Sequence, residues 1–275
     1  MFWSRRECKA VSCTFLDVCA GLANLNVMKR AREPAPTTGT AEGFLQKAMA
    51  ARSAASRARL ARQGLATRAP LDRVTQSMLL RQLYLALFEL RMFEKAQEIA
   101  EQMLALRVLP DVCHHDMARV MAVLDNVDGA AGHLRLAARL APASRRAFHL
   151  WTLGSLLFLS GQLEPAQSAF LRAIRWSTTD RPLYVGHLAL VRATRNEIVE
   201  DIDEVILHLE EAACGQGYGR FVLGLLCFHA GRRVDAERYL RAFVSRTRAG
   251  RPAMAIALEA ELALADQRLA ELDVN

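Results

Sequence analysis

Residues 147–180 read AFHLWTLGSLLFLSGQLEPAQSAFLRAIRWSTTD and predict two amphipathic helices joined by a tight turn. In the first half, apolar and small residues recur at the spacing of one helix face, at Leu150, Leu153, Gly154 and Leu157. Gly161 ends that helix, because glycine adopts a left-handed turn at low cost, and Pro165 fits the first turn of the next helix. A second stripe follows at Ala166, Ala169, Phe170 and Ala173. The stretch therefore predicts a helical hairpin.

The same pattern recurs on both sides of this stretch. Ala96 and Ala130 hold equivalent places in successive units and lie 34 residues apart. From Ala130 to Ala166 the spacing is 36, which indicates two extra residues in the intervening turn, filled by Arg145 and Arg146. A period of this length is typical of a repeat protein, in which each unit packs only on its neighbours.

We expect five units, over residues 77–110, 111–144, 147–180, 181–216 and 217–250. Residues 41–70 are helical in pattern and predict an N-terminal cap or a degenerate repeat. Residues 251–272 predict a C-terminal capping helix, since the last repeat would otherwise expose its hydrophobic face.

The hairpin resembles the tetratricopeptide repeat, whose 34-residue unit has a Leu-Gly pair in its first helix and an Ala-x3-Phe step in its second. The matching residues here are Leu153-Gly154 with Ala166 and Phe170, and Leu223-Gly224 in the fifth unit. The resemblance covers about residues 77–272. It implies a right-handed α-solenoid that binds another protein.

Composition agrees with an all-α protein. The 275 residues are 52% hydrophobic and 24% charged, and Ala, Leu and Arg, which favour helices, dominate. The net charge of +7 suits an acidic partner, a nucleic acid or an anionic membrane surface, but it equally follows from the arginine-rich coding of GC-rich bacterial genomes. We interpret it in this last way and expect a bacterial protein.

No motif for catalysis, cofactor binding or metal binding emerges from the sequence. Cys113-His114-His115-Asp116 resembles a metal cluster, but consecutive residues on a helix point in different directions. The glycine-rich stretch 214–219 follows a predicted helix rather than a strand, so it does not match a phosphate-binding loop. None of the six cysteines forms a CxxC pair, which favours a reduced, cytoplasmic protein. We therefore expect a protein that is not an enzyme and that has no cofactor.

The first 40 residues differ from the rest. Residues 1–27 are Cys-rich and lack the Ala, Leu and Arg pattern, and 29–40 have the composition of a linker. Three interpretations stay open for residues 1–27: a secretory or twin-arginine signal, a disordered tail, or a stretch upstream of a working start at Met28. The sequence has no apolar run long enough for a transmembrane helix.

The family resemblance implies that a partner lies along the inner faces of the first helices. Carried over residue by residue, these faces present Arg81, Leu85, Phe88, His115, Arg119, Phe148, Trp151, Phe158, Arg192, Tyr218, Phe221 and Phe228. They predict an apolar and aromatic groove with scattered positive charge. Such a groove suits an extended apolar segment or an amphipathic helix of a protein partner, with arginines pairing its acids.

Alternatives to this adaptor remain. The groove could be filled by the chain's own residues 1–40 or by a second copy in a homodimer. The basic surface of residues 47–68 could serve a nucleic-acid-associated α-solenoid, although we expect no nucleic-acid partner because aromatic residues are not interleaved with it. An exported or lipid-anchored assembly factor would depend on residues 1–27.

Overall fold

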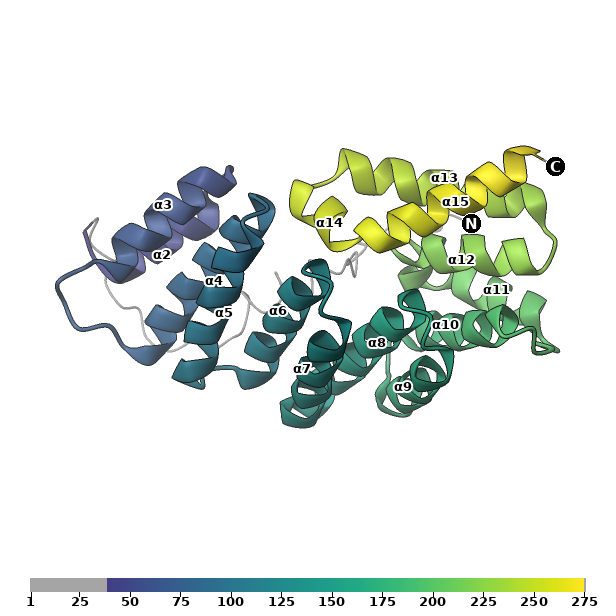
Figure 1. Ribbon diagram of the computed structural model, residues 1–275, viewed down its shortest axis with the longest axis horizontal. Helices are drawn as coiled ribbons and strands as arrows, with labels where there is room; N and C mark the ends of the chain where they lie inside the picture. The colour runs from purple at the N-terminus through teal and green to yellow at the C-terminus, as the bar shows by residue number, and fades with distance from the viewer. Residues whose placement is uncertain (1–38, 275) are drawn as a thin grey trace, which may run out of the picture. The chain divides into compact units, whose positions relative to one another are not determined.

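The computed structural model describes residues 39–274, which form helices joined by short connections, with no strand in that range (Figure 1). This confirms the expected all-α class. Within the same range, no helix has the length and apolar character needed to cross a membrane. The described chain forms two compact units. We call residues 39–177 with 251–259 the N-terminal unit, and residues 178–250 with 260–274 the C-terminal unit.

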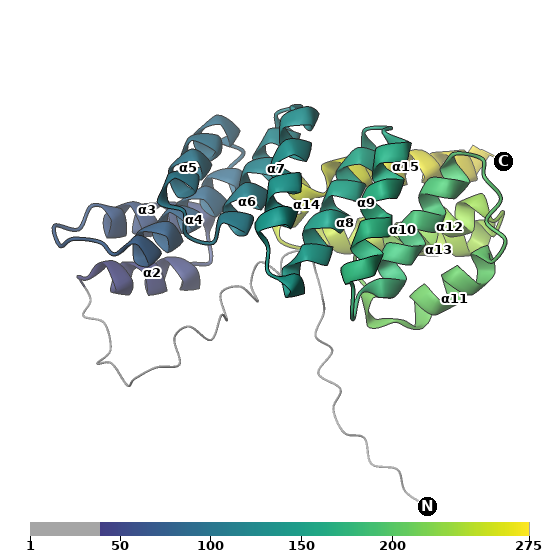
Figure 2. The ribbon, with the colours of Figure 1, turned by 90° about the horizontal axis from the view of Figure 1, so that it is seen from below.

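The N-terminal unit is a series of helical hairpins. In chain order its helices are α2 (Ala41–Ala50), α3 (Ala54–Leu65), α4 (Arg73–Glu89), α5 (Phe93–Leu106), α6 (Pro110–Val123), α7 (Val127–Leu140), α8 (Ala143–Leu159) and α9 (Leu163–Trp176). Each helix packs on the one before it, as Figures 1 and 2 both show. A short helix from the far end of the chain, α14 (Pro252–Ala257), packs against α4. There Ile256 joins the hydrophobic core of α3, α4, α5 and α6.

The C-terminal unit continues the hairpin pattern with a looser fourth repeat. It contains α10 (Arg181–Thr194), α11 (Ile202–Glu211), a short 3-10 helix (Ala213–Gly215), α12 (Gly219–His229), α13 (Arg233–Ala249) and α15 (Glu259–Val274). Residues 195–201 separate α10 from α11 and form a longer connection than the turns of the other hairpins. Residues 251–272 contain two helices rather than a single capping helix, because α14 ends at Ala257 and α15 begins at Glu259.

The hairpin turns share one backbone conformation. A residue with positive φ follows each first helix from α4 to α12, at Arg91, Asp125, Gly161, Asn196 and Gly231. The residue that directly follows it, such as Gln162, donates its N–H to a carbonyl five residues earlier, here that of Leu157 at 2.8 Å. This bond closes the end of the helix in the manner of a Schellman motif. The five hairpins from α4 to α13 thus turn in the same way, whether or not their sequence supplies a glycine.

The two helices of a hairpin cross at a position that has no room for a side chain. A Cβ atom added to Gly154 of α8 would lie 2.6 Å from the ring of Phe170 in α9. At the equivalent place in the fifth unit, a Cβ on Gly224 would lie 2.6 Å from Leu240. Both distances are far below ordinary van der Waals contact. The Leu-Gly pair is therefore required by close helix packing.

The turn predicted before the third unit is wrong. Arg145 and Arg146 lie within the first turn of α8, which begins at Ala143 after Pro142. The two residues that lengthen the period are therefore part of helix α8. As a result, both arginine side chains reach back towards α6 and α7.

Gly154→Ala is expected to lower the free energy of unfolding by about 1–3 kcal/mol, because the added methyl group overpacks the crossing with Phe170. Urea denaturation followed by circular dichroism measures the change. Gly132→Ala in α7 is the matched control, since nothing lies within 4 Å of an added Cβ there. It should stabilise the helix by up to about 1 kcal/mol. Equal effects at the two glycines would contradict the packing argument.

Candidate functional site

Most of the inner-face residues predicted in the N-terminal unit are buried. They come from α4, α6 and α8, the first helices of three successive hairpins. Six of them have at most 8% of their surface exposed: Arg81, Phe88, His115, Arg119, Trp151 and Phe158. Leu85 and Phe148 are half-buried. The helix assignments hold, whereas the binding of a partner by these side chains stays a prediction.

Buried polar contacts join α4 to α6. Arg81 Nε donates to Asp116 Oδ2 at 2.8 Å, and the Tyr84 hydroxyl donates to the backbone carbonyl of Asp116 at 2.6 Å. The guanidinium of Arg119 lies 4.8 Å from the centre of the Phe88 ring, which is a cation–π geometry. Two of the predicted arginines therefore contact groups of the chain itself.

A second set of polar contacts joins α6 to α8. Arg145 forms a bidentate pair with Asp111, with Nε–Oδ2 at 2.8 Å and Nη2–Oδ1 at 2.9 Å. His149 Nε2 lies 3.3 Å from the same carboxylate, and its Nδ1 lies 3.3 Å from Nδ1 of His115. The His115 ring in turn packs on Phe148, with ring centres 5.1 Å apart.

The electrostatics of this network follow from its burial and its pairs. Burial by itself would raise the pKa of Asp111, but hydrogen bonds from His149 and Arg145 outweigh it and hold that pKa well below its usual value. Burial, followed by the nearby charges of His149 and Arg119, lowers the pKa of His115 well below its usual value. At neutral pH, Asp111 is thus ionised and His115 is neutral.

The side chains of residues 113–116 contact four different partners. Cys113 Sγ donates to the carbonyl of Val108 at 3.2 Å, and His114 Nδ1 lies 2.9 Å from Nδ1 of His133. His115 and Asp116 face α8 and α4, as above. Within residues 39–274, no group of three or more His, Cys, Asp or Glu side chains is arranged to hold a metal ion.

In the C-terminal unit, two of the predicted aromatic residues form the core. Tyr218 and Phe221 are 8% and 0% exposed, and both pack on Phe243 of α13. The Tyr218 hydroxyl lies 3.3 Å from Oε1 of Glu261 in α15, and burial raises the pKa of Glu261 to about 7. Phe228 is half-buried, with the guanidinium of Arg268 at 5.1 Å from its ring centre.

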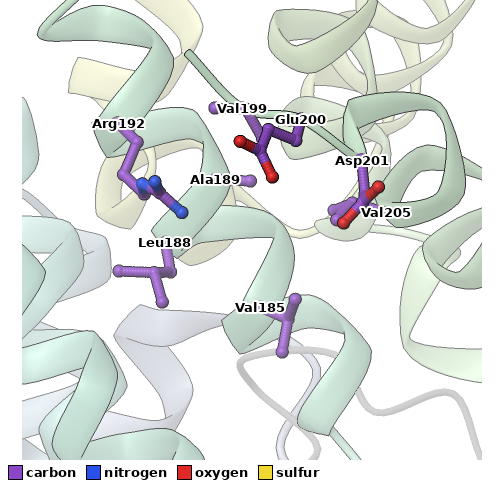
Figure 3. A pocket seen from close by; sticks show the side chains of 8 residues that line it. All are labelled: Val185, Leu188, Ala189, Arg192, Val199, Glu200, Asp201 and Val205. Atoms are coloured by element: carbon purple, nitrogen blue, oxygen red, sulfur yellow. The ribbon is translucent and has the colours of Figure 1, made fainter. Parts of the chain in front are cut away.

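The remaining predicted residue, Arg192, lies beside an open pocket of about 260 Å³ in the C-terminal unit (Figure 3). Apolar side chains of α10 and α11 line it, namely Val185, Leu188, Ala189 and Val205, with Val199 from the connection between them. Figure 3 shows Arg192 on one side, across from Glu200 and Asp201. Arg192 Nε lies 3.4 Å from Glu197, in a pair whose side chains are 45% and 34% exposed. Such an exposed pair is weak and exchanges readily.

Neither a scan against models of known protein families nor a search of curated proteins finds a match for this chain. Among solved structures, the apo form of RapI is similar with a TM-score of 0.53 at 12% identity, over 87% of each chain. The fold is tetratricopeptide-like. Identity this low shows the fold alone.

Two other solved structures also match, with lower scores. The APC/C hetero-tetramer Cut9-Hcn1 has a TM-score of 0.48 at 13% identity, over 92% of this chain and 58% of that one. The structure of Naa15/Naa10 bound to HypK-THB has a TM-score of 0.29 at 16% identity, over 84% and 42%.

The polar contacts between hairpins are the feature that sequence reasoning missed. Asp111 and Arg145 are 34 residues apart, as are His115 and His149. Side chains about one repeat apart lie on facing helices of neighbouring hairpins, so opposite charges at about that spacing predict a bridge between repeats. This signal was available, but the placement of Arg145 in a turn concealed it.

Arg145→Leu is expected to destabilise the N-terminal unit by about 3 kcal/mol, because it leaves the buried Asp111 carboxylate without its main counter-charge. Urea denaturation followed by tryptophan fluorescence measures the loss. Arg241→Leu is the control, since it breaks the exposed pair with Glu237 and should cost less than about 1 kcal/mol. A loss at Arg145 no larger than that of the control would contradict a buried, ionised pair.

Glu261→Gln is expected to stabilise the C-terminal unit in a pH-dependent way. The pKa of Glu261 in the folded state, about 7, exceeds its ordinary value of 4.5. Between pH 4.5 and 7 the folded state therefore retains the proton, and the free energy of unfolding falls as pH rises through that window. The neutral amide avoids this loss, and its benefit should reach about 3 kcal/mol near pH 8 and vanish below pH 4.5.

Hydrogen exchange of peptides from α12 and α15, at several pH values, measures the effect of Glu261→Gln in the C-terminal unit alone. Glu237→Gln on the exposed face of α13 is the control and should show no such dependence on pH. A benefit of Glu261→Gln that is the same at low and high pH would show that the carboxyl titrates normally.

Proposed function

We propose that this protein is a non-catalytic adaptor that binds an apolar segment of a partner protein, with an acidic residue of that segment paired by Arg192. The pocket between α10 and α11 is the observation that supports this proposal most directly. It includes Arg192, which the inner-face prediction names, and it provides accessible apolar surface from Val185 and Leu188. Its volume of about 260 Å³ suits one large apolar side chain of a bound segment rather than a whole small molecule.

The charges at the pocket favour a peptide as the ligand. Arg192 can leave its weak pair with Glu197 and bind a carboxylate, while Glu200 and Asp201 on the other side can accept hydrogen bonds from backbone N–H groups. One buried apolar side chain contributes roughly 1.5–3 kcal/mol before ordering costs. A single pocket therefore supplies an anchor, and micromolar affinity requires further contacts along the segment.

The other inner-face residues have a different part in this proposal. Leu85, Phe148 and Phe228 have partly exposed side chains that could extend the contact surface, each within its own unit. The buried members, such as Trp151 and Phe221, hold the first helices in place. Their replacement by alanine would create cavities and is therefore a poor test of binding.

The two alternative functions have weaker support. The basic surface of residues 47–68 would serve nucleic acids, but Arg57 is already paired with Glu89 at 2.8 Å. Export or lipid anchoring depends on residues 1–27, which lie outside the described residues.

Leu188→Glu is expected to abolish capture of the partner, since it puts a charge among the apolar side chains of the pocket. The measurement is affinity capture from native lysate with the full chain, identified by mass spectrometry. A peptide array of the captured protein should then locate an apolar segment with a neighbouring acid. Val234→Glu is the control, because Val234 is 81% exposed on α13 of the same unit. A protein that both variants retain equally would contradict the pocket assignment.

A further inference from the structure

The second helices of two adjacent hairpins, α7 and α9, expose apolar side chains in their C-terminal halves. Leu136 and Leu140 of α7 are 38% and 47% exposed, and Leu171 and Trp176 of α9 are 46% and 44% exposed. Leu140 and Trp176 are 36 residues apart, which is the spacing between these two repeats. Ordinary solvent-facing positions of a repeat carry polar residues, so a repeated apolar pattern marks a surface with a partner.

Four arginines surround these apolar residues. Arg135 and Arg139 of α7 and Arg172 and Arg175 of α9 are all exposed. Each helix has a single acid, Asp128 and Glu164 respectively, in its first turn and away from this end. We call the four apolar residues and the four arginines the basic-apolar surface.

Arg146 of α8 joins the two halves of this surface. Its guanidinium donates to the carbonyls of Ala138 and Ala141 at the end of α7, at 3.2 and 3.1 Å. The same guanidinium lies 4.3 Å from the centre of the Trp176 ring at the end of α9. The C-terminal ends of α7 and α9 are therefore held together within the N-terminal unit.

A surface of opposite charge lies on α11 in the C-terminal unit. Exposed acids occur in and just before this helix, at Glu200, Asp201, Asp203, Glu204, Glu210 and Glu211. Two exposed apolar residues accompany them, since Leu207 is 51% exposed and Ile198, in the connection before α11, is 81% exposed. Asp203 with Arg232, Glu204 with His208 and Glu210 with Arg238 form exposed, weak pairs within the chain, and Glu210 also accepts a hydrogen bond from the Tyr239 hydroxyl.

We infer that this protein self-associates, with α11 of one copy packing on the basic-apolar surface of a second copy. Charge complementarity favours this contact, because an acidic helix with exposed apolar residues meets an arginine-rich surface with exposed leucines. The two surfaces differ, so each copy carries one of each. Two copies form a closed dimer if both contacts are made at once. Otherwise each copy binds the next one, and a longer assembly forms.

Packing against a helix suits these apolar side chains better than insertion into a lipid surface. About half of each leucine is already covered by its own unit, so little of it protrudes. A membrane-binding helix buries its whole apolar face several ångströms deep. A neighbouring helix needs only shallow ridges and grooves. The inferred contact shares Glu200 and Asp201 with the edge of the pocket at α10, whereas Glu204 and Glu211, which the test below changes, do not line that pocket.

Sedimentation velocity of the full chain at low salt tests this inference with two charge-reversed variants. One carries Arg139→Glu and Arg175→Glu, and the other carries Glu204→Arg and Glu211→Arg. Each alone should associate at least about tenfold more weakly than the wild type, because like charges then face each other. An equimolar mixture should recover association, since the native α11 of the first variant meets the native basic-apolar surface of the second.

Glu98→Arg with Glu101→Arg on α5 is the matched control and should associate as the wild type does. Association of the wild type should weaken as salt screens the charges. A wild type that stays monomeric, variants that associate normally, or a mixture that stays monomeric would each overturn the inference. So would binding of a monomeric wild type to vesicles of anionic phospholipid through the same arginines.

Discussion

The close crossing of two helices within a hairpin is the constraint on which the repeat geometry depends. At Gly154 and Gly224 the neighbouring helix approaches until not even a methyl group fits. The second helices fill the space beside these glycines with Phe170 and Leu240, and they also carry small buried residues such as Ala166 and Ala236, both 0% exposed. With the crossing fixed, the left-handed residue in each turn sets the direction in which the second helix returns. The repeat is therefore specified by where side chains are small as much as by where they are apolar.

The two units join successive hairpins by different chemistry. In the N-terminal unit, buried ion pairs and hydrogen bonds link the first helices, as between Asp111 and Arg145. In the C-terminal unit, ring packing links the first helices, as between His187 of α10 and Tyr218 at the start of α12, whose ring centres lie 5.8 Å apart. Buried pairs contribute little net stability, but a wrong alignment of helices would leave a charge unpaired. The polar links therefore favour one register between repeats, whereas the aromatic packing supplies more of the hydrophobic free energy.

The sequence was sufficient to predict the all-α class and the tetratricopeptide-like repeat fold. Glycines and alanines at helical spacing signal the hairpins directly, as at Gly154 and Gly161. The sequence was insufficient to predict the turns at Arg91 and Asp125, because these residue types do not indicate a positive φ. It also failed at Arg145 and Arg146, which the sequence places in a turn and which lie in the first turn of α8.

The candidate site was harder to predict than the fold. Helical periodicity places Phe88 and Arg119 on the same side of their helices, yet it cannot say that one will stack on the other. Burial at such positions depends on side chains from the next repeat, and its prediction needs the register between repeats. Arg192, which the sequence places on the inner face, lines a pocket that depends on the irregular connection to α11, which has no counterpart in the family pattern.

The position of α14 has a consequence for the order in which the protein can be completed on the ribosome. Ile256 belongs to the core of the N-terminal unit, although nearly the whole chain precedes it in the sequence. Hairpins made early can form, since their contacts are local, but the first core lacks a part until the last helices emerge from the exit tunnel. During synthesis, the apolar side chains that Ile256 later covers remain available to chaperones or to neighbouring nascent chains.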